Sequence, residues 1–505
     1  MSQRSLKAEL LEQRLSQNLY TAQCVREGEV EAAKQLSIPL YDVMQVAGET
    51  LFDWIQTHFD HQTNILIAVG TGNNGGDGYV AASLLLADGY TITLASIDPA
   101  RPLSGDALLA QQSWLASGGE VADIRLVDTE HFELIVDGLL GTGLKGTVTS
   151  AYQSVIQRIN QSSAHILSID IPSGLDANTG ASLGASINAD TTISFVGLKT
   201  GLVTGNGKQK SGNLIFKPLN IGETFGQLME AQGRLIEYAD FAPLAPRALH
   251  SHKGNNGKLL CIGGNNGMAG AIRMTSEAAL RTGVGLVKVY CHANSTSSIV
   301  QGRPEIMASS ENLAQLLEWA DCIVFGPGLG QTSWSQETFN QLFSYLIHHH
   351  KPLIIDADGL NLLSHQLHAL QLSYLIMSPH SAEAARLLNT DVEKIENDRY
   401  GAATKLVERY GGNCILKGAG SIVHSQQGTY VCANGNPGMS TAGMGDVLSG
   451  VLGSLAAQGM TADEASLFGV CIHSAAADLV ADNFGQRGMI ASDLFDYLRQ
   501  LVNRK

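Results

Sequence analysis

The sequence predicts two doubly wound α/β domains, and three observations support this prediction. The chain has 505 residues, more than one ordinary hydrophobic core accommodates. Short apolar runs alternate with amphipathic helical patterns along both halves of the chain. Many of the 55 glycines directly follow these apolar runs, where parallel sheets place their ligand-binding loops.

The first domain is expected over residues 1–225. Residues 1 to about 60 carry apolar side chains at three- and four-residue spacing, which predicts helices. Apolar runs that end in Gly or Asp follow and are typical of parallel strands covered on both faces: NILIAVG, TITLASI, FELIVDG, HILSIDI and TTISFVG. The segment Glu223–Lys253 breaks the pattern and contains two prolines, so the domain boundary is expected there.

The second domain is expected over residues 235–505. The alternation restarts with GKLLCIGG, GLVKVYC, DCIVFGPG, KPLIIDADG, SYLIMSPH and GNCILKGAG. Glycine- and alanine-rich helices that can pack closely are expected within GDVLSGVLGSLAAQG and ASLFGVCIHSAAADLVAD.

Composition and charge exclude several classes of protein. A hydrophobic content of 44% with 16% charged residues excludes a disordered chain. The net charge of −15 argues against nucleic acid as a partner. We expect no membrane segment, because no run reaches the roughly 18 to 20 apolar residues that a membrane helix needs. Seven scattered cysteines without zinc-binding spacing predict a reducing, cytoplasmic location.

A glycine-rich turn follows the first predicted strand. Gly70–Gly75 fits the G-x-G-x-x-G pattern and precedes a predicted helix, Tyr79–Asp88, which alone indicates a dinucleotide site. Asp77, expected in the first turn of that helix, would compete with a pyrophosphate for the helix dipole. Asp98 after the next strand keeps the dinucleotide interpretation open. Alternatively, the polar residues of the turn cap the helix.

Polar residues also follow two further strands of this domain. Asp137 ends one strand, and Asp170 and Ser173 follow the next. Because the carboxyl ends of parallel strands converge on one crevice, these residues favour a functional site over isolated caps or turns.

The motifs NNGGDG, VDGLLGTGL and DIPSGLDANTG resemble the NAD(P)H-hydrate epimerase domain, with a Rossmann-like three-layer fold, over nearly all of residues 1–225. That family interconverts the R and S forms of a nicotinamide dinucleotide hydrated at C6 of the reduced ring. The resemblance implies K⁺ at Asn74, Asp137 and Ser173, whose oxygen atoms suit an alkali cation. It implies substrate contacts at Asn73, Asn74, Gly75, Gly76, Asp77, Gly141, Thr142, Gly143, Leu144, Lys145, Gly146, Thr147 and Asp170.

Inversion of a carbon that bears a hydroxyl beside a ring nitrogen needs a group that takes and returns protons. Asp170 is the predicted acid and base. Lys145, in the loop GTGLKGT, is the predicted cationic partner that steadies the charged open form.

The second domain contains a glycine-rich segment, Asn436–Asp446 (NPGMSTAGMGD), directly before a predicted helix. Backbone N–H groups of such a turn bind anions. The Asp446 carboxylate suits a base that acts on a hydroxyl while the turn holds a transferring phosphoryl group. Alternatively, Asp446 is only an N-cap of the helix.

Other strand ends of this domain carry polar or glycine-rich loops toward the same predicted edge of the sheet. Lys417–Ser421 and Gly326–Gly330 follow two strands, Asp356 and Asp358 follow a third, and His380 follows a fourth. No Walker A sequence is present in the chain, so a nucleotide would bind in another way.

The G-x-G-D ending resembles the ribokinase-like superfamily. Within it, HKGNNGKLLCIGG, FGPGLG, DADGLN, SPHSAE, KGAGS and NPGMSTAGMGD resemble the ADP- or ATP-dependent (S)-NAD(P)H-hydrate dehydratase, from about residue 235 to the carboxyl terminus. The resemblance implies Mg²⁺ with the nucleotide, and Asp446 as the base that deprotonates the C6 hydroxyl. It implies contacts with the hydrated cofactor at Ala271, Gly328 or Gly330, His380 and Asp446. It implies nucleotide contacts at Lys417, Gly418, Ala419, Gly420, Ser421, Asn436, Pro437, Gly438, Met439, Ser440, Thr441, Ala442, Gly443, Met444 and Gly445.

Together these features predict a bifunctional enzyme, expected to be a homo-oligomer, that acts in series on hydrated NADH and NADPH; the choice between ADP and ATP stays open. One alternative is a small-molecule kinase with a regulatory dinucleotide-binding amino-terminal domain. Another is an inactive dinucleotide sensor, against which the joint presence of Asn74, Asp137, Asp170 and Ser173 argues.

Overall fold

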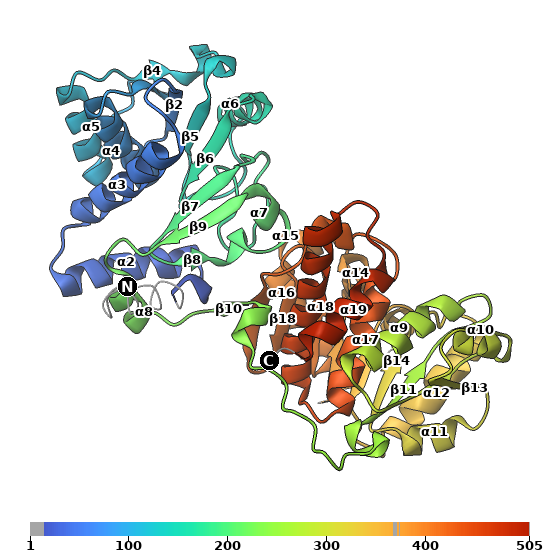
Figure 1. Cartoon of the computed structure of the whole chain (residues 1–505). Coiled ribbons are helices and arrows are strands. Elements are labelled where there is room, and N and C mark those ends of the chain that lie inside the picture. The colour runs from blue at the N-terminus through green and yellow to red at the C-terminus, as the bar shows by residue number, and fades with distance from the viewer. Residues whose placement is uncertain (1–14, 367–370, 373, 504–505) are drawn as a thin grey trace. The chain divides into compact units, whose positions relative to one another are not determined.

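The computed structural model describes residues 15–366, 371–372 and 374–503, and the chain separates into two compact units, Met1–Leu235 and Ile236–Lys505 (Figure 1). The sequence predicts domains over 1–225 and 235–505, and the structural division falls within the short strand β10 (Gly233–Ile236). The helical pattern expected over residues 1 to about 60 is confirmed for α2 (Ala22–Leu36) and α3 (Leu40–His58), and its first 14 residues lie outside the described residues.

The first unit is built on a parallel sheet with the strand order β4-β3-β2-β5-β6-β7-β9. The apolar runs predicted as strands form β2, β3, β5, β6 and β7. The order runs outward in both directions from β2, which confirms the doubly wound α/β prediction for this unit. The strands are β2 (Asn64–Val69), β3 (Thr91–Ser96), β4 (Ala122–Asp123), β5 (Leu134–Gly138), β6 (His165–Ile169), β7 (Thr191–Phe195) and β9 (Asn213–Lys217).

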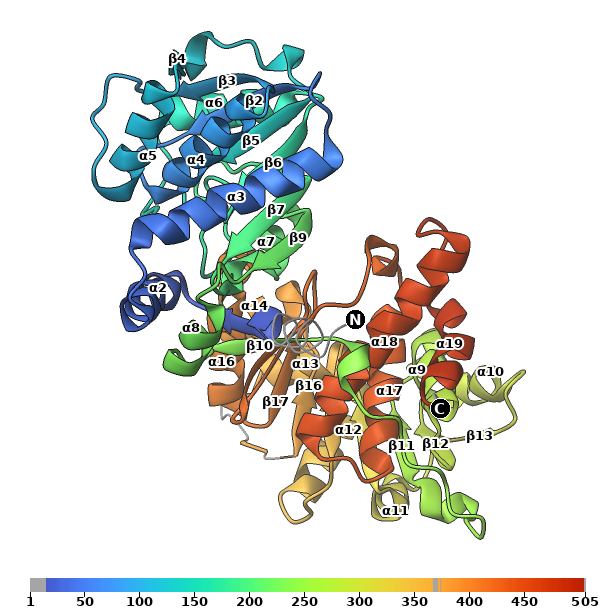
Figure 2. The same ribbon diagram turned by 60° about the vertical axis from the view of Figure 1, so that its left-hand side comes forward.

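Helices cover both faces of this sheet, because alternate residues of the central strand β2 are apolar on each face. Ile65 and Ile67 of β2 belong to a core with α2, α3, α4, α5 and α8, whereas Leu66 and Ala68 belong to a core with α6. Figure 2 shows α3, α4 and α5 lying along the strands. The helices are α2 (Ala22–Leu36), α3 (Leu40–His58), α4 (Asn73–Ala87), α5 (Gly105–Ala116), α6 (Ser150–Gln161), α7 (Gly205–Lys210) and α8 (Gly222–Leu228); β1 (Asn18–Tyr20) and β8 (Leu198–Lys199) are short strands outside this sheet.

Helix α4 begins at Asn73 and not at Tyr79 as the sequence predicts, so the NNGGDG motif forms its first turns. The expectation that polar residues of this motif cap the helix is wrong, because no side chain caps its N-terminus, and Asp77 lies beyond the first turn. A Cβ at Gly75 would lie 2.3 Å from the carbonyl oxygen of Gly70. Glycine therefore lets the helix start directly against the end of β2.

The second unit has a parallel sheet with the order β13-β12-β11-β14-β15-β16-β17, extended by the antiparallel strands β18 and β19. The order again runs outward in both directions, here from β11, which confirms a second doubly wound α/β unit. The strands are β11 (Lys258–Ile262), β12 (Leu286–Tyr290), β13 (Ile306–Ser309), β14 (Cys322–Phe325), β15 (Leu353–Ile355), β16 (Leu375–Met377), β17 (Asn413–Leu416), β18 (Ile422–Ser425) and β19 (Gly428–Cys432).

Closely packed helices cover this second sheet. A Cβ at Gly450 in α17 would lie 2.1 Å from the carbonyl oxygen of Thr275 in α9, so the glycine lets these helices approach closely. The helices are α9 (Ala269–Thr282), α10 (Thr296–Val300), α11 (Leu313–Trp319), α12 (Ser333–Leu346), α13 (Asp358–Ser364), α14 (Ser381–Leu388), α15 (Val392–Asn397), α16 (Arg399–Tyr410), α17 (Met444–Ala457), α18 (Ala462–Phe484) and α19 (Leu494–Leu501).

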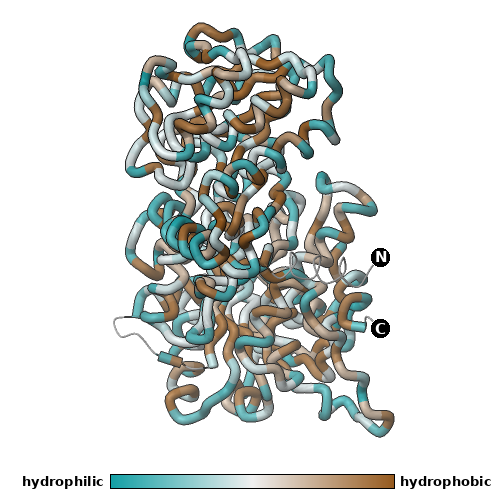
Figure 3. Tube along the Cα trace, turned by 90° about the vertical axis from the view of Figure 1, so that its left-hand side faces the viewer, coloured by the Kyte–Doolittle hydropathy of each residue, from teal (hydrophilic) through white to brown (hydrophobic). Residues whose placement is uncertain are grey.

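Helix α18 is long and apolar enough to cross a membrane by length and composition alone. However, 72% of its most apolar 18-residue window is buried inside the protein, and Phe468, Val470 and Ile472 belong to the core of this unit. We therefore assign α18 as a core helix. Figure 3 shows stretches of hydrophobic residues alternating with hydrophilic ones along the trace of each unit.

Candidate functional sites

The first unit contains a cavity of about 680 Å³ that includes loops at the carboxyl ends of β2, β5 and β6. The structure brings most of the predicted substrate-binding residues together around it: Asn73, Asn74, Gly75, Asp77, Gly141, Thr142, Gly143, Leu144, Lys145 and Asp170. The remaining predicted residues, Gly76, Gly146, Thr147, Asp137 and Ser173, do not line it. A crevice at the carboxyl edge, on both sides of the strand where the order reverses, is where doubly wound folds bind ligands.

Asp170 follows β6 with a left-handed φ of +62°, a conformation that non-glycine residues adopt rarely. Its Oδ1 accepts hydrogen bonds from the Phe195 backbone N–H (2.9 Å) and from Lys199 Nζ. The Lys199 side chain is 1% exposed and also donates to the Phe195 carbonyl oxygen (2.9 Å). Asp170 Oδ2 accepts no hydrogen bond from the described residues and is left for a ligand.

Three further carboxyl groups line this cavity: Glu29 from α2, Asp77 from α4 and Asp106 from α5. Burial and the nearby charge of Asp170 raise the pKa of Glu29 to about 7. Burial, followed by the charges of Glu29 and Asp170, raises the pKa of Asp77 well above its ordinary value. The cavity is therefore able to hold a protonated acid near Asp170, whose carboxyl group pairs with Lys199.

The predicted K⁺ residues form a buried oxygen-rich cluster next to this cavity. Asp137 accepts hydrogen bonds from Ser173 Oγ (2.5 Å), the Ser173 N–H (2.8 Å) and Ser168 Oγ (2.9 Å). Asn74 Nδ2 donates to the Leu140 carbonyl oxygen (3.4 Å), and Ser173 Oγ donates to the same oxygen (3.2 Å). Burial raises the pKa of Asp137, although the bonds from Ser173 oppose this. No cationic side chain of the described residues forms an ion pair with Asp137, so a metal cation fits the donor set.

The second unit gathers its charged side chains where α17 meets the ends of β15 and β17. Lys417 Nζ donates to Asp356 Oδ1 (2.7 Å), and Ser449 Oγ of α17 donates to Asp356 Oδ2 (2.8 Å). Asp446 lies in the first turn of α17. Burial, followed by the charge of Asp356, raises the pKa of Asp446 to about 7.

The structure excludes a simple cap as the role of Asp446, because Gly443 occupies the N-cap position and makes no side-chain bond. The Asp446 carboxyl group accepts no hydrogen bond from the described residues. A buried, unpartnered carboxyl group with a pKa near neutrality is suited to general-base chemistry.

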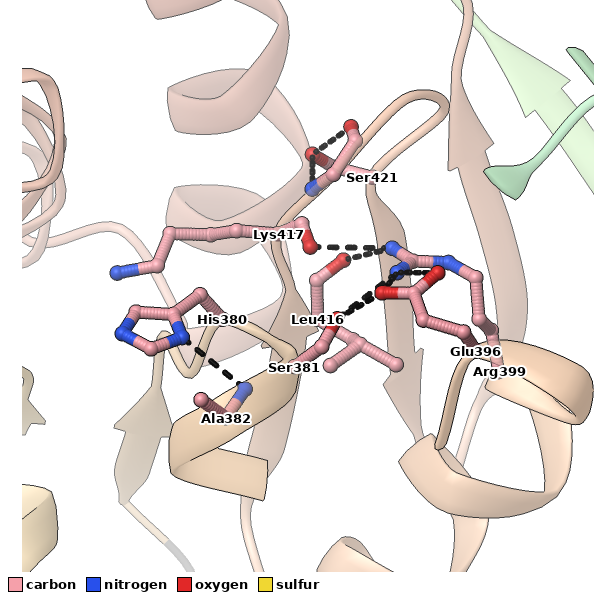
Figure 4. Close-up of polar contacts among 9 residues, drawn as sticks. His380, Ser381, Ala382, Glu396, Arg399, Leu416, Lys417 and Ser421 are labelled. Carbon is pink, nitrogen blue, oxygen red and sulfur yellow. Dashed lines mark hydrogen bonds and ion pairs between the residues drawn. The ribbon is translucent and has the colours of Figure 1, made fainter. Parts of the chain in front are cut away.

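His380 lies beside Lys417 at the start of α14 (Figure 4). Its Nδ1 accepts a hydrogen bond from the Ala382 N–H (3.1 Å), which leaves Nε2 as the protonated nitrogen of the neutral ring. Nε2 lies 3.4 Å from Glu383 Oε1. Burial, and then the charge of Lys417, lower the pKa of His380, so the ring is neutral at physiological pH.

The side chain of Arg399 binds the backbone at the start of the predicted nucleotide loop Lys417–Ser421 (Figure 4). The guanidinium group is 1% exposed and donates to the carbonyl oxygens of Leu416 and Lys417, both at 3.1 Å. Gly418 has a φ of +154°, and a Cβ there would lie 2.7 Å from Arg399 Nη2. Only glycine fits at position 418, because the Cβ of any other residue would collide with the Arg399 side chain.

The second predicted nucleotide loop, Asn436–Gly445, is ordered by Asp478 of α18. Asp478 accepts hydrogen bonds from Asn436 Nδ2 and the Gly435 N–H, both at 2.9 Å, and Asn436 Oδ1 accepts from the Gly438 N–H (3.0 Å). Gly443, with a φ of +91°, then turns the chain into α17. The loop therefore ends at a helix N-terminus, where free N–H groups favour an anion.

The remaining predicted contacts of this unit come from the Gly326–Gly330 loop and α9. A Cβ at Gly328 would lie 3.2 Å from Ala271 Cβ, and the Gly330 N–H donates to Asp358 Oδ2 (2.8 Å). Asp358 contributes to the raised pKa of Asp446, which places this loop near the same carboxyl group.

Sequence reasoning missed four side chains of these sites: Glu29, Lys199, Arg399 and Asp478. Glu29 and Asp478 lie in predicted helices without a motif, and Lys199 and Arg399 lie outside the predicted strands and motifs. The four share no local sequence signal, and only the fold brings them to the sites.

Both units match known families. Residues 259–500 match the NAD(P)H-hydrate dehydratase family, and residues 40–201 match the family described as YjeF-related protein N-terminus. The bifunctional NAD(P)H-hydrate repair enzyme Nnr of Escherichia coli (strain K12) is 43% identical over 490 residues, 96% of this chain and 94% of that protein.

Solved structures resemble about half of this chain. A ribokinase-like superfamily protein from Enterococcus faecalis V583 has a TM-score of 0.50 at 25% identity, covering 54% of this chain and 95% of that chain. The ADP/ATP-dependent NAD(P)H-hydrate dehydratase from Bacillus subtilis, co-crystallised with ATP and Mg²⁺, has a TM-score of 0.45 at 25% identity, covering 51% of this chain and 93% of that chain.

Proposed function

This chain belongs to the family of bifunctional NAD(P)H-hydrate repair enzymes, and from that premise we propose which of its residues perform each reaction. The first unit interconverts the R and S forms of hydrated NADH and NADPH. The second unit dehydrates the S form to NADH or NADPH and consumes ADP or ATP. The observation that carries this division is that each unit holds its own poised carboxyl group, Asp170 beside Lys199 and Asp446 beside Lys417.

In the second unit, Asp446 is the base of the dehydration. Its carboxylate takes the proton of the C6 hydroxyl, whose oxygen attacks the terminal phosphorus of the nucleotide and displaces ADP from ATP, or AMP from ADP. Phosphate is a far better leaving group than hydroxide. The lone pair of the ring nitrogen then expels it, and loss of the C5 proton restores the reduced nicotinamide.

Two loops of this unit are suited to hold the nucleotide phosphates. Lys417 supplies a cation beside the first loop, and Asn436–Gly445 leads into the N-terminus of α17, where backbone N–H groups favour an anion. Mg²⁺, which prefers phosphate and carboxylate oxygens, would arrive with the nucleotide and neutralise charge on the transferring phosphoryl group. The carboxyl oxygens of Asp446 are available to Mg²⁺, since no donor among the described residues occupies them.

In the first unit, Asp170 is the group that takes and returns the hydroxyl proton. Its three donors all reach Oδ1, so Oδ2 is available to the substrate while Lys199 fixes the carboxylate in place. Lys145 also lines the cavity, and we propose that it contacts the negatively charged part of the dinucleotide.

Asn74, Asp137 and Ser173 would hold K⁺ beside this cavity. Their oxygen atoms are hard donors, and Asp137 is a buried carboxyl group with no cationic partner among the described residues. The ion supplies a fixed positive charge there, which favours ionised Asp137 and any negative charge that develops on the substrate. We also propose a cytoplasmic location, because all seven cysteines are buried free thiols.

A single incubation tests the proposed function. The protein is mixed with hydrated NADH containing both forms, and with ATP or ADP and Mg²⁺. We expect the near-ultraviolet absorbance of the reduced nicotinamide to return and both forms to disappear. A stable phosphorylated product without recovery of absorbance would instead indicate a small-molecule kinase.

A further inference from the structure

Glu29 is an acidic side chain of α2 that faces the cavity of the first unit and has no partner. The other acidic residues of this helix are exposed: Glu27 accepts a hydrogen bond from Gln23 Nε2 (2.9 Å), and Glu31 lies 3.6 Å from Lys34 Nζ. Glu29 is instead partly buried and lines the cavity, and no described residue donates a hydrogen bond to it. An acid in this position is costly unless it does something for the ligand.

Charged groups from several elements face Glu29. They are Asp170 after β6, Lys199 of β8, Asp77 of α4, Asp106 of α5 and, one turn away on α2, Arg26. Lys199 is committed to Asp170, and the Arg26 Nη1 atom donates to the Thr142 carbonyl oxygen (3.0 Å).

Because so many carboxyl groups share this cavity, they cannot all be ionised at once. Asp170 is the one that forms an ion pair, with Lys199. Glu29 keeps its proton to higher pH, since burial and the charge of Asp170 raise its pKa to about 7. The cavity thus holds a carboxyl group paired with a cation and, in Glu29, a second carboxyl group that keeps its proton up to about pH 7.

The epimerisation requires both kinds of group. To open the ring, the C6 hydroxyl must lose a proton as its C–O bond becomes a carbonyl, and the ring nitrogen must gain one as the C6–N1 bond breaks. Asp170 alone accounts for the first transfer. The second needs an acid, and Lys199 is bound to Asp170 and to backbone oxygen.

We propose that Glu29 is the second proton-transfer group of the epimerase, the acid that protonates the ring nitrogen as the ring opens. This assignment rests on the proposed function of the first unit. Asp170 Oδ2 takes the hydroxyl proton, the electron pair of the C6–N1 bond goes to N1, and Glu29 gives its proton to N1. Rotation about the C5–C6 bond presents the other face of the carbonyl.

Ring closure then reverses each transfer. N1 attacks the carbonyl carbon and returns its proton to Glu29, and Asp170 returns its proton to the oxygen. Both carboxyl groups end as they began, so no oxidant, reductant or further reactant is consumed.

The test compares Glu29→Gln with Glu27→Gln on the same helix. We expect Glu29→Gln to lower the kcat of epimerisation by about 100-fold or more with little change in KM, whereas Glu27→Gln keeps the wild-type rate. Glu29→Asp, which restores a carboxyl group, should recover part of the loss. Dehydration of the pure S form and the thermal transition of the first unit show that each variant is folded.

The wild-type pH profile tests the same assignment without any substitution. The kcat of epimerisation should fall as the pH rises through about 7, the pKa of Glu29, and Glu29→Gln should lack this fall. A wild-type rate in folded Glu29→Gln, or a flat wild-type profile above neutrality, would overturn the assignment. If the wild-type protein itself does not interconvert the two forms, it is the proposed function that fails.

Discussion

Asp446→Asn should abolish dehydration and, at the same time, stabilise the second unit. The substitution keeps the size of the side chain and removes its ability to take a proton. We expect the rate of dehydration to fall by roughly 10² to 10⁴, the usual contribution of a general base. Epimerisation, which uses residues of the first unit, should be unaffected.

The stability change follows from the pKa of Asp446, which burial raises from 3.8 to about 7. Each pKa unit corresponds to about 1.4 kcal/mol, so ionised Asp446 costs the fold roughly 2 to 4 kcal/mol, the lower end allowing for partial exposure. The sign of this stability change follows from the number of protons that the folded and the unfolded states bind at each pH. Below about pH 4 both states are protonated and the cost is absent; it grows as the pH rises toward 7 and is constant above.

Calorimetry of the full chain measures this effect. The transition of the second unit should lie higher in Asp446→Asn than in wild type at about pH 8, with the difference shrinking toward about pH 5. Asp482→Asn, an exposed change on α18, is the matched control. If Asp446 only stabilised the helix N-terminus, the variant would instead lose about 1 kcal/mol, and that result would refute the reasoning.

Three further outcomes are expected. Lys199→Met should abolish epimerisation and destabilise the first unit by about 3 kcal/mol or more in denaturant unfolding, because it leaves Asp170 without its ion pair; unchanged epimerisation would remove Lys199 from the site. Arg399→Lys should raise the KM for the nucleotide more than it changes kcat, since one ammonium group cannot hold both loop carbonyls, and an unchanged KM would contradict this. Replacing K⁺ by tetramethylammonium should slow epimerisation and leave dehydration of the S form intact; equal rates in both salts would remove the K⁺ site from the account.

The strands and glycine-rich loops were predictable from the sequence because their determinants are local. Parallel strands buried on both faces require continuous apolar runs, and NILIAVG and DCIVFGPG suit no other secondary structure as well. The start of α4 was predicted six residues late. Its first turns consist of Asn and Gly, which favour turns, and the helix forms there because Gly75 packs against Gly70.

The partners of the functional carboxyl groups were not predictable because they are distant in the sequence. Lys199 reaches Asp170 across 29 residues, and Lys417 reaches Asp356 across 61. Lys145 was chosen as the cationic partner because it lies in a motif, yet the buried cation that contacts Asp170 is Lys199. Glu29 has the sequence context of a solvent-exposed helical residue, and only the fold turns it toward the cavity.

The most direct measurement mixes two variants that are each deficient in one reaction. Asp170→Asn alone, with nucleotide, should clear the S form and leave the R form. Asp446→Asn alone should interconvert the forms and clear neither. Together they should clear the R form, because each protein supplies the reaction that the other lacks. Persistence of the R form in the mixture would contradict the claim that each unit carries a complete and independent active site.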